Sequence, residues 1–288
     1  MHFKEIPPAQ NTQEVQARHE GNRQAWNEAA QEYAADNEQR VQNLQAGKSN
    51  LHPIERRNLA RLGPFKDWCQ RAIHLQCASG YDTMSLVLEG VHEVVGVDIS
   101  DGHIENARLT SERLAMPATW YRCDVLATPV ELNGTADLVY TGRGAINWLH
   151  DLGSWASVVQ RLLKTDGILH LLEDHPASWL FDQDSETLVA SNLDYFNHVE
   201  SNQGWPSSYL GDEGSSLGPA GTPVTEQSTK YECLWTIANV VQALINAGLT
   251  IEYLGEHPEP YWDAFPQLRS DLKAKIPMTY SLMAQKTA

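Results

Sequence analysis

The stretch AIHLQCASGYD at residues 72–82, followed by VVGVDIS at residues 94–100, decides the fold. Each stretch opens with a short apolar run typical of a buried β-strand, and the first run leads through a turn of small residues into a helical pattern at 81–90. A strand, a turn, a helix and a second strand form the right-handed unit from which parallel sheets are built. The two stretches therefore predict an α/β protein.

The same alternation continues toward the C-terminus. Strands are expected at 119–125, 136–141 and 167–173, then at 249–256 and 278–286. Between them lie helical patterns at 102–115, 154–164 and 236–248. The second pattern carries an apolar stripe of Trp155, Val158, Val159, Leu162 and Leu163 before a stop signal at 164–167, and the third carries Ile237, Val240, Val241, Leu244 and Ile245. We expect a Rossmann-like seven-stranded, mostly parallel sheet with helices on both faces.

Two segments fall outside this rhythm. Residues 14–46 predict a helix, broken at Gly21, and we assign residues 1–60 to an N-terminal helical cap. Residues 61–288 form the main domain, in which 177–234 follow the fifth strand and are rich in Asp, Ser, Gly and Pro. Because structureless loops of that length are uncommon in compact domains, we interpret 177–234 as an inserted lid with two strands.

Composition excludes several classes of function. The 288 residues are 42% hydrophobic, which is typical of a globular protein. The formal charge of −16, with no basic cluster, disfavours nucleic acid and anionic membrane surfaces as partners. We find neither a signal peptide nor an apolar run of membrane-spanning length, and we expect a cytoplasmic protein whose four scattered cysteines are reduced thiols.

Three consecutive strand tips carry the residues that point to a ligand. The first strand ends in a turn containing Gly80, the second ends at Asp98 and the third at Asp124. Open α/β sheets bind ligands at this carboxyl edge, where an acid after the second strand can accept both hydroxyls of a ribose. Asp124 can accept from an exocyclic amine such as that of adenine, or it can simply cap the next turn. The order and spacing of the three tips predict a nucleoside cofactor.

At this point the sequence resembles the class I S-adenosylmethionine-dependent methyltransferases, in a bacterial small-molecule branch, over nearly everything from residue 20 onward. IHLQCASG at 73–80 matches the family's LDLGCGTG turn, and GVDIS at 96–100, DLVYTGRGAINWLHDL at 137–152 and LLKTDGILHLLEDHP at 162–176 match further. Gln76 and Ala78 replace two glycines of the family turn, and His74 replaces its acid. The resemblance implies an antiparallel last strand and S-adenosylmethionine as cofactor.

The resemblance also implies a set of cofactor-binding residues. The methionine and ribose would contact the first turn, and Asp98 would hold the ribose hydroxyls. Ile99 would pack on adenine, and Asp124 with Val125 would read the adenine amine. The loop after the fourth strand would face the sulfonium, and Trp26 and Tyr33 would close over the site, although Trp26 also suits simple packing. The residues of the two loops are Gln76, Cys77, Ala78, Gly80, Thr141, Gly142 and Arg143.

Methyl transfer from this cofactor requires mainly that the acceptor is held close to the methyl group in the right orientation, and it requires few reactive side chains. Glu173 and His175 at the fifth strand tip, and His150 after the fourth, are candidate general bases, and each also suits a hydrogen-bonded loop support. With Asp151 and Asp174 they have the residue types of a metal site, but they lack a recognised ligand spacing such as HExxH, so we expect no metal.

The aromatic residues of the C-terminal third favour a small organic acceptor over a macromolecule. The sequence therefore predicts an enzyme that transfers the methyl group to a small molecule by in-line displacement. A non-catalytic sensor or scaffold that binds S-adenosylmethionine or S-adenosylhomocysteine is the alternative, and a dinucleotide oxidoreductase is disfavoured because GxGxxG is absent. The insertion at 177–234 could also support a homodimer.

Overall fold

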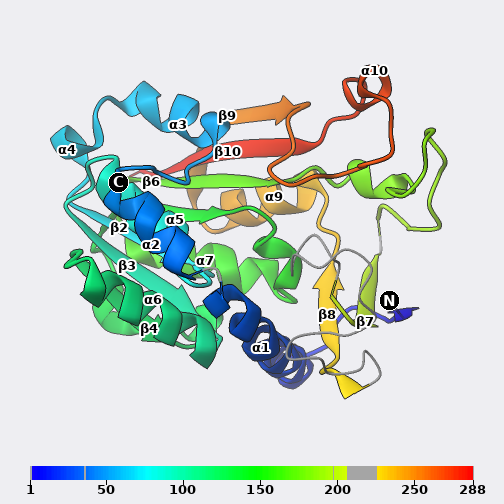
Figure 1. Ribbon diagram of the computed structural model, residues 1–288, viewed down its shortest axis with the longest axis horizontal. Coiled ribbons are helices and arrows are strands. Elements are labelled where there is room, and N and C mark those ends of the chain that lie inside the picture. Colours follow the sequence, from blue (N-terminus) through cyan, green and yellow to red (C-terminus); the bar gives the residue numbers. More distant parts are fainter. Residues whose placement is uncertain (1, 36, 197, 206–225, 288) are drawn as a thin grey trace.

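The computed structural model describes residues 2–35, 37–196, 198–205 and 226–287. Its main feature is a seven-stranded sheet in the order β4-β3-β2-β5-β6-β10-β9, in which only β10 runs antiparallel to its neighbours (Figure 1). The strands are β2 (Arg71–Leu75), β3 (Glu93–Asp98), β4 (Ala118–Arg122), β5 (Ala136–Gly142), β6 (Leu163–Asp174), β9 (Leu249–His257) and β10 (Thr279–Lys286). The predicted fold class is confirmed, with the antiparallel last strand.

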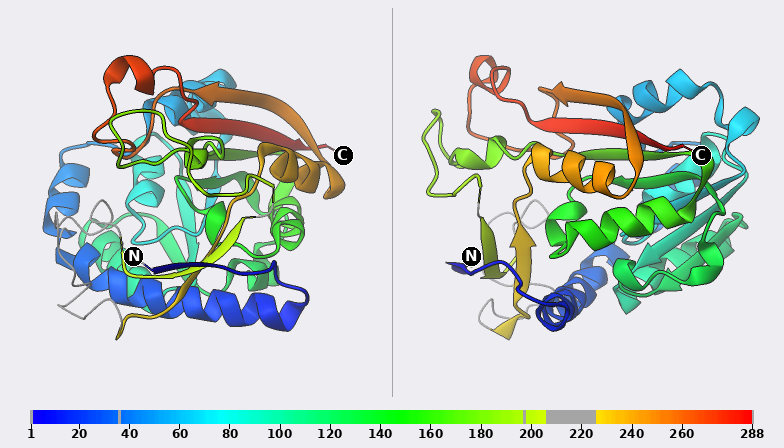
Figure 2. Two further views of the ribbon diagram at one scale, coloured as in Figure 1. Left: turned by 90° about the vertical axis from the view of Figure 1, so that its right-hand side faces the viewer. Right: turned by 180° about the vertical axis from the view of Figure 1, so that it is seen from behind.

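Helices cover both faces of this sheet. The helices of the N-terminal half are α1 (Thr12–Ala35), α2 (Asn37–Gln45), α3 (Pro53–Leu59), α4 (Phe65–Trp68), α5 (Tyr81–Leu88) and α6 (Asp101–Arg113). In the described part of the C-terminal half, the helices are α7 (Leu152–Leu162), α9 (Ile237–Asn246) and α10 (Ser270–Lys273). In the view from behind, α7 and α9 lie across the face opposite to α2 and α5 (Figure 2).

The core divides along the same two faces. On one face the buried side chains of α7 and α9 pack against β2, β5, β6 and β10, with Trp155 and Leu162 fully buried. On the other face Leu59, Phe65 and Leu86 pack against β2, β3 and β5. The expected stripe on α7 is entirely buried, whereas on α9 Ile245 is 49% exposed, contrary to prediction. Helix α7 ends at Leu162, two residues before the expected end. The expected stop signal at 164–167 belongs to β6, which begins at Leu163.

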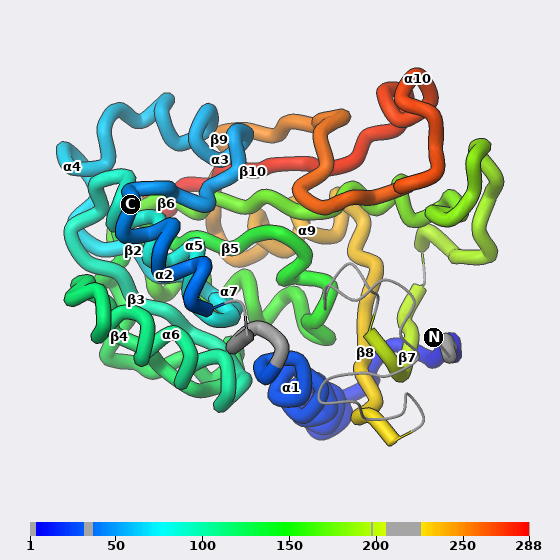
Figure 3. Tube along the Cα trace, viewed as in Figure 1, coloured from blue at the N-terminus to red at the C-terminus, as the bar shows by residue number. Residues whose placement is uncertain are grey.

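A second, three-stranded sheet brings the N-terminus to the insertion. Strand β1 (His2–Glu5) pairs with β7 (Val199–Gln203), and β7 pairs with β8 (Lys230–Cys233), all antiparallel. The trace shows this small sheet beside α1, at the edge of the main domain (Figure 3). The insertion therefore contains two strands, as predicted, although residues 197 and 206–225 of it lie outside the described part of the chain.

Helix α1 runs unbroken through Gly21, contrary to the expected break there. A Cβ atom at this position would lie 2.6 Å from the Tyr231 ring and 3.0 Å from the Thr229 carbonyl oxygen. Glycine is thus required by the close approach of β8 rather than by a helix end. The helical pattern changes instead after Ala35, where α1 ends, and α2 begins at Asn37.

Candidate functional site

A cavity of about 320 Å³ lies at the carboxyl edge of the main sheet, between the tips of β2 to β5 and helix α1. Its size is at the lower end of the range for small-molecule sites. Ten of the twelve predicted cofactor residues line it: Gln76, Cys77, Ala78, Gly80, Asp98, Ile99, Asp124, Val125, Gly142 and Arg143. The structure therefore brings the turn and both strand-tip acids together around one space, as the carboxyl-edge rule requires.

The turn after β2 keeps a left-handed backbone although two glycines are replaced. Gln76, Ala78 and Gly80 have φ values of +58°, +45° and +73°. Such a conformation costs a residue with a Cβ roughly 1–2 kcal/mol. Gln76 is held there by its side-chain amide, which donates to the Ala145 carbonyl oxygen at 2.7 Å. At Gly80 a Cβ would lie 2.4 Å from the Trp120 ring, so only glycine fits.

Asp98 joins this turn to the tip of β3. Its Oδ2 accepts from the Ala78 N–H and its Oδ1 from the Ser100 N–H, both at 2.8 Å. Burial raises the pKa of Asp98 to about 6, although these N–H groups favour the carboxylate. A carboxylate has about four lone-pair sites, so Asp98 can still accept from a ligand in the cavity.

Asp124 at the tip of β4 caps a turn and contacts helix α1. Its Oδ1 accepts from the Leu126 N–H at 2.9 Å and caps the 3₁₀ turn Val125–Ala127, while its Oδ2 lies 2.7 Å from Nδ1 of His19 on α1. Burial acts to raise the pKa of Asp124, but His19 holds it below its usual value. Asp124 therefore caps the turn, as the alternative predicted, and also lines the cavity.

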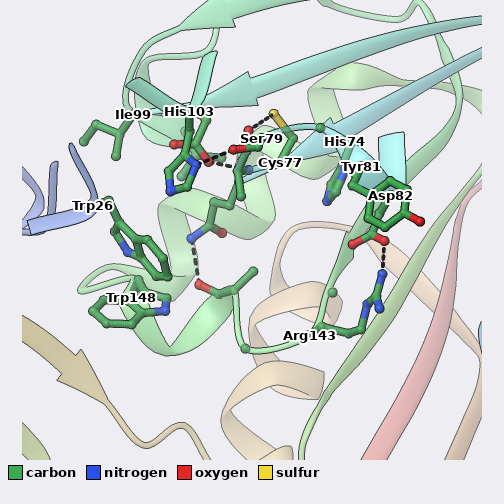
Figure 4. A pocket seen from close by; sticks show the side chains of 18 of the residues that line it. Trp26, His74, Cys77, Ser79, Tyr81, Asp82, Ile99, His103, Arg143 and Trp148 are labelled. Atoms are coloured by element: carbon green, nitrogen blue, oxygen red, sulfur yellow. Dashed lines mark hydrogen bonds and ion pairs between the residues drawn. The ribbon is translucent and has the colours of Figure 1, made fainter. Parts of the chain in front are cut away.

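The opposite end of the cavity holds a charged group around Arg143 (Figure 4). Arg143 has φ +57° and forms an ion pair with Asp82, and its Nε lies 3.7 Å from Glu55 Oε1. Tyr140 donates to the same Glu55 oxygen at 2.5 Å. Burial raises the pKa of Glu55 to about 7, against the opposing charge of Arg143. The guanidinium thus reaches the cavity with its charge balanced by acids.

Aromatic side chains close the other side. Trp26 and Trp148 line the cavity, with ring centroids 5.0 Å apart. Figure 4 shows both rings on the side of Ile99 and His103, away from Arg143. Trp205, which follows β7 in the insertion, packs on Trp26 at 4.7 Å and on Trp148 at 6.0 Å. The cavity therefore has a charged end and an aromatic end.

The predicted base candidates lie outside the cavity lining. Glu173 is 1% exposed and accepts from the N–H groups of Gly144 and Ile146, at 2.5 and 3.0 Å, so it supports the loop after β5. His175 places Nε2 2.7 Å from Glu256 and accepts from the Ala177 N–H at Nδ1. Both groups have the hydrogen bonds of a loop support, which was the alternative reading of each.

The remaining predicted residues are also dispersed. His150 is buried against Cys233, with 3.1 Å between Nδ1 and Sγ, and Asp151 caps α7 through the Ser154 N–H. No group of three or more His, Cys, Asp or Glu side chains in the described ranges is arranged to hold a metal ion. Thr141 is fully buried in β5, donates to the Leu75 carbonyl oxygen at 3.2 Å and lies outside the lining. Tyr33 belongs to α1, but its side chain lies outside the described part of the structure.

The cavity has further lining residues, of which only Trp26 was expected near the site from the sequence. His19, Asn22 and Trp26 recur at helical spacing on the inner side of α1, and only Trp26 was considered. Their spacing was a usable signal, but the polar residues around them obscured which side faces inward. The other additions are Arg40, Asn50, His74, Ser79, Tyr81, Asp82, His103, Gly144, Ala145, Trp148, Leu149 and Tyr261.

Comparisons with known proteins agree with this geometry. Residues 72–167 match the family model described as a methyltransferase domain. A proposed S-adenosylmethionine-dependent methyltransferase from Listeria monocytogenes is 18% identical, with a TM-score of 0.55, over 81% of this chain and 98% of that one. Methyltransferases of the same kind from Mesorhizobium loti and Clostridium acetobutylicum are 18% and 11% identical and have TM-scores of 0.54. They align over 80% and 83% of this chain and over 97% and 93% of their own.

Residues 72–167 thus match a methyltransferase domain, and the chain has the fold of these S-adenosylmethionine-dependent methyltransferases. No sequence among the curated proteins matches the chain. Within the described ranges, no helix has both the length and the apolar character needed to cross a membrane.

Proposed function

We propose that this protein binds S-adenosylmethionine in the cavity and transfers its methyl group to a small organic acceptor by direct in-line displacement. The observation that carries the proposal is the convergence of the left-handed turn, Asp98 and Asp124 on one space. The Oε1 atom of Gln76 adds support, because it is buried and has no hydrogen-bond partner among the described residues. A cationic amino group of the cofactor would satisfy it.

In this proposal the residues bind and orient rather than react. Asp98 accepts the ribose hydroxyls, Ile99 packs on the adenine, and Asp124 with Val125 reads the adenine amine. Gln76 to Gly80 hold the methionine part. When bound, the cofactor supplies an activated methyl group with its own leaving group, so the protein needs mainly to align the acceptor and exclude water. Glu173 and His175 support loops in this scheme, and a base role for either stays a prediction.

The acceptor site is proposed at the aromatic end. Trp205 comes from the insertion and contacts both cavity tryptophans, so the described part of 177–234 reaches the mouth of the cavity. Aromatic walls suit an apolar organic acceptor and shield a cationic methyl donor. We therefore propose 177–234 as the cover of the acceptor site, and 1–60 as the cap that supplies α1. The negative charge of the chain supports a small molecule rather than nucleic acid as the acceptor.

A non-catalytic protein that binds the cofactor would use the same turn, so only turnover with an acceptor distinguishes it from the enzyme. Gln76 and Ala78 keep a left-handed backbone at the two positions where the family turn has glycines. The turn can still present its N–H groups to a ligand.

Titration calorimetry with S-adenosylhomocysteine tests the proposal. We expect Asp98→Asn and Asp98→Ala to lose about 1.5–3 kcal/mol of binding free energy, roughly 10- to 150-fold in Kd, because the ribose hydroxyls lose a charged acceptor. Glu93→Ala is the matched control, because Glu93 lies at the other end of β3 in a surface pair with Arg71. Unchanged binding in both Asp98 variants would rule out the assignment, and release of S-adenosylhomocysteine in the presence of candidate acceptors measures the transfer itself.

A further inference from the structure

His19 on α1 links the tip of β4 to the loop after β5. Its Nδ1 lies 2.7 Å from Asp124 Oδ2 at the tip of β4, and its Nε2 accepts from the His150 N–H in the loop after β5 at 3.1 Å. The His19 side chain is only 5% exposed. One turn further along α1, Asn22 donates to the Trp148 carbonyl oxygen in the same loop. This side of α1 is therefore tied to the wall by directed hydrogen bonds.

The two partners of His19 fix its tautomer. Because the His150 N–H can only donate, Nε2 of His19 must be the acceptor and carries no proton. The ring proton of the neutral imidazole then lies on Nδ1, where it donates to the Asp124 carboxylate. His19 thus presents one donor and one acceptor, each already aimed at its partner.

These bonds determine how Asp124 faces the cavity. The Leu126 N–H occupies one lone pair of Oδ1, and the His19 ring occupies one lone pair of Oδ2. Held at both oxygens, the carboxylate plane has a set orientation, and its free lone pairs are those left for a ligand. Without the His19 bond, only the capping bond to Leu126 would restrain the Asp124 side chain, which is 22% exposed, and Oδ2 could turn toward solvent.

We propose that His19 is a positioning residue that sets adenine specificity by orienting Asp124. The inference rests on the proposed function, in which Asp124 accepts from the 6-amino group of adenine. A 6-oxo base in the same place would direct a carbonyl oxygen at a carboxylate, so the fixed Asp124 selects the amine and rejects the carbonyl. His19 does not need to touch the cofactor to have this effect.

Two substitutions of His19 separate its two hydrogen bonds. His19→Asn places its amide N–H near the position of Nδ1 and keeps the donor to Asp124, but it loses the acceptor for the His150 N–H. His19→Gln places its amide near the position of Nε2 and keeps that acceptor, but it loses the donor to Asp124. Asn22→Ala is the control, because it removes bonds between α1 and its neighbours while leaving the His19–Asp124 pair intact.

The measurement is the ratio of dissociation constants for S-inosylhomocysteine, the 6-oxo analogue, and S-adenosylhomocysteine on the same sample of each protein. Because both ligands are compared on one sample, the fraction of folded protein cancels. We expect the wild-type protein and His19→Asn to favour the adenine ligand at least tenfold, and His19→Gln to favour it less than threefold. Asn22→Ala should weaken both ligands and keep the wild-type ratio.

Other results would overturn either the positioning role of His19 or the proposed function. An unchanged ratio in His19→Gln, or a ratio that falls equally in His19→Gln and Asn22→Ala, would overturn the positioning role. Equal affinity of the wild-type protein for both ligands would overturn it as well, because Asp124 would not be reading the amine. If the wild-type protein bound neither ligand, the proposed function itself would fail.

Discussion

Replacement of Gly80 by alanine is expected to destabilise the protein, through its left-handed backbone and through overlap with the Trp120 ring. Gly80 has φ +73°, and a Cβ there would lie 2.4 and 2.7 Å from two ring atoms of Trp120. The indole cannot turn aside freely, because its Nε1 donates to Ser111 Oγ at 2.9 Å. The left-handed backbone costs alanine about 1–2 kcal/mol, and the overlap with the ring adds about 1–3 kcal/mol.

Gly134→Ala provides a matched control for the backbone part of this cost. Gly134 has φ +64°, and nothing lies within 4 Å of a Cβ built there. Both substitutions change the entropy of the unfolded chain alike, so that contribution cancels between them. We expect the free energy of unfolding to fall by about 1–2 kcal/mol in Gly134→Ala and by about 2–5 kcal/mol in Gly80→Ala.

Urea unfolding followed by tryptophan fluorescence and circular dichroism measures both losses. A third comparison uses Trp120→Leu as the background, where the overlap with the ring disappears. There we expect the cost of Gly80→Ala to fall toward that of Gly134→Ala, since interacting sites are not additive, with a remainder from the Ala107 Cβ, 3.0 Å from the added Cβ. Equal costs of the two alanine substitutions in the wild-type background would refute the reasoning, and so would a cost at Gly80 that is independent of Trp120.

Two further predictions concern Glu173 and the insertion. Burial raises the pKa of Glu173 to about 8, so its protonated form stabilises the fold below pH 4.5 and this contribution is lost as the pH rises through 8. Urea unfolding should therefore show that, from pH 5 to pH 8, the free energy of unfolding of the wild-type protein falls relative to that of Glu173→Gln. A pH-independent difference between the two proteins would contradict this. Hydrogen exchange should show slower exchange in 177–234 with S-adenosylhomocysteine and an acceptor mimic, and equal exchange would disprove the cover.

The order of strands and helices was readable from local pattern. Short apolar runs alternate with helical stripes such as that of α7, and both are set by neighbouring residues in the chain. The strand tips followed from the same reading, because each acid directly ends an apolar run. Asp98 and Asp124 could thus be assigned to one edge before any contact was known. The sequence also showed that the turn lacked two family glycines.

Side-chain partners were not readable in this way. Glu173 and His175 have residue types that suit a base, and only the fold shows that backbone N–H groups of a neighbouring loop or strand-end turn hold them. From the sequence, Gly21 looked like a helix break. The reason for the glycine is the close approach of β8 to α1, which joins segments about 200 residues apart in the chain. Local periodicity contains no information about such contacts.

The sequence by itself therefore determined the α/β class, the seven strands and the edge at which the acids meet, because periodicity and strand-end position are local properties. Only the tertiary structure decided which side of α1 faces the cavity, that Gln76 and Ala78 keep the left-handed turn, and that His19 meets Asp124. Residues 19 and 124 are brought together by the packing of α1 across the sheet edge. That packing depends on the combined burial and hydrogen bonding of many distant side chains, which no single stretch of sequence specifies.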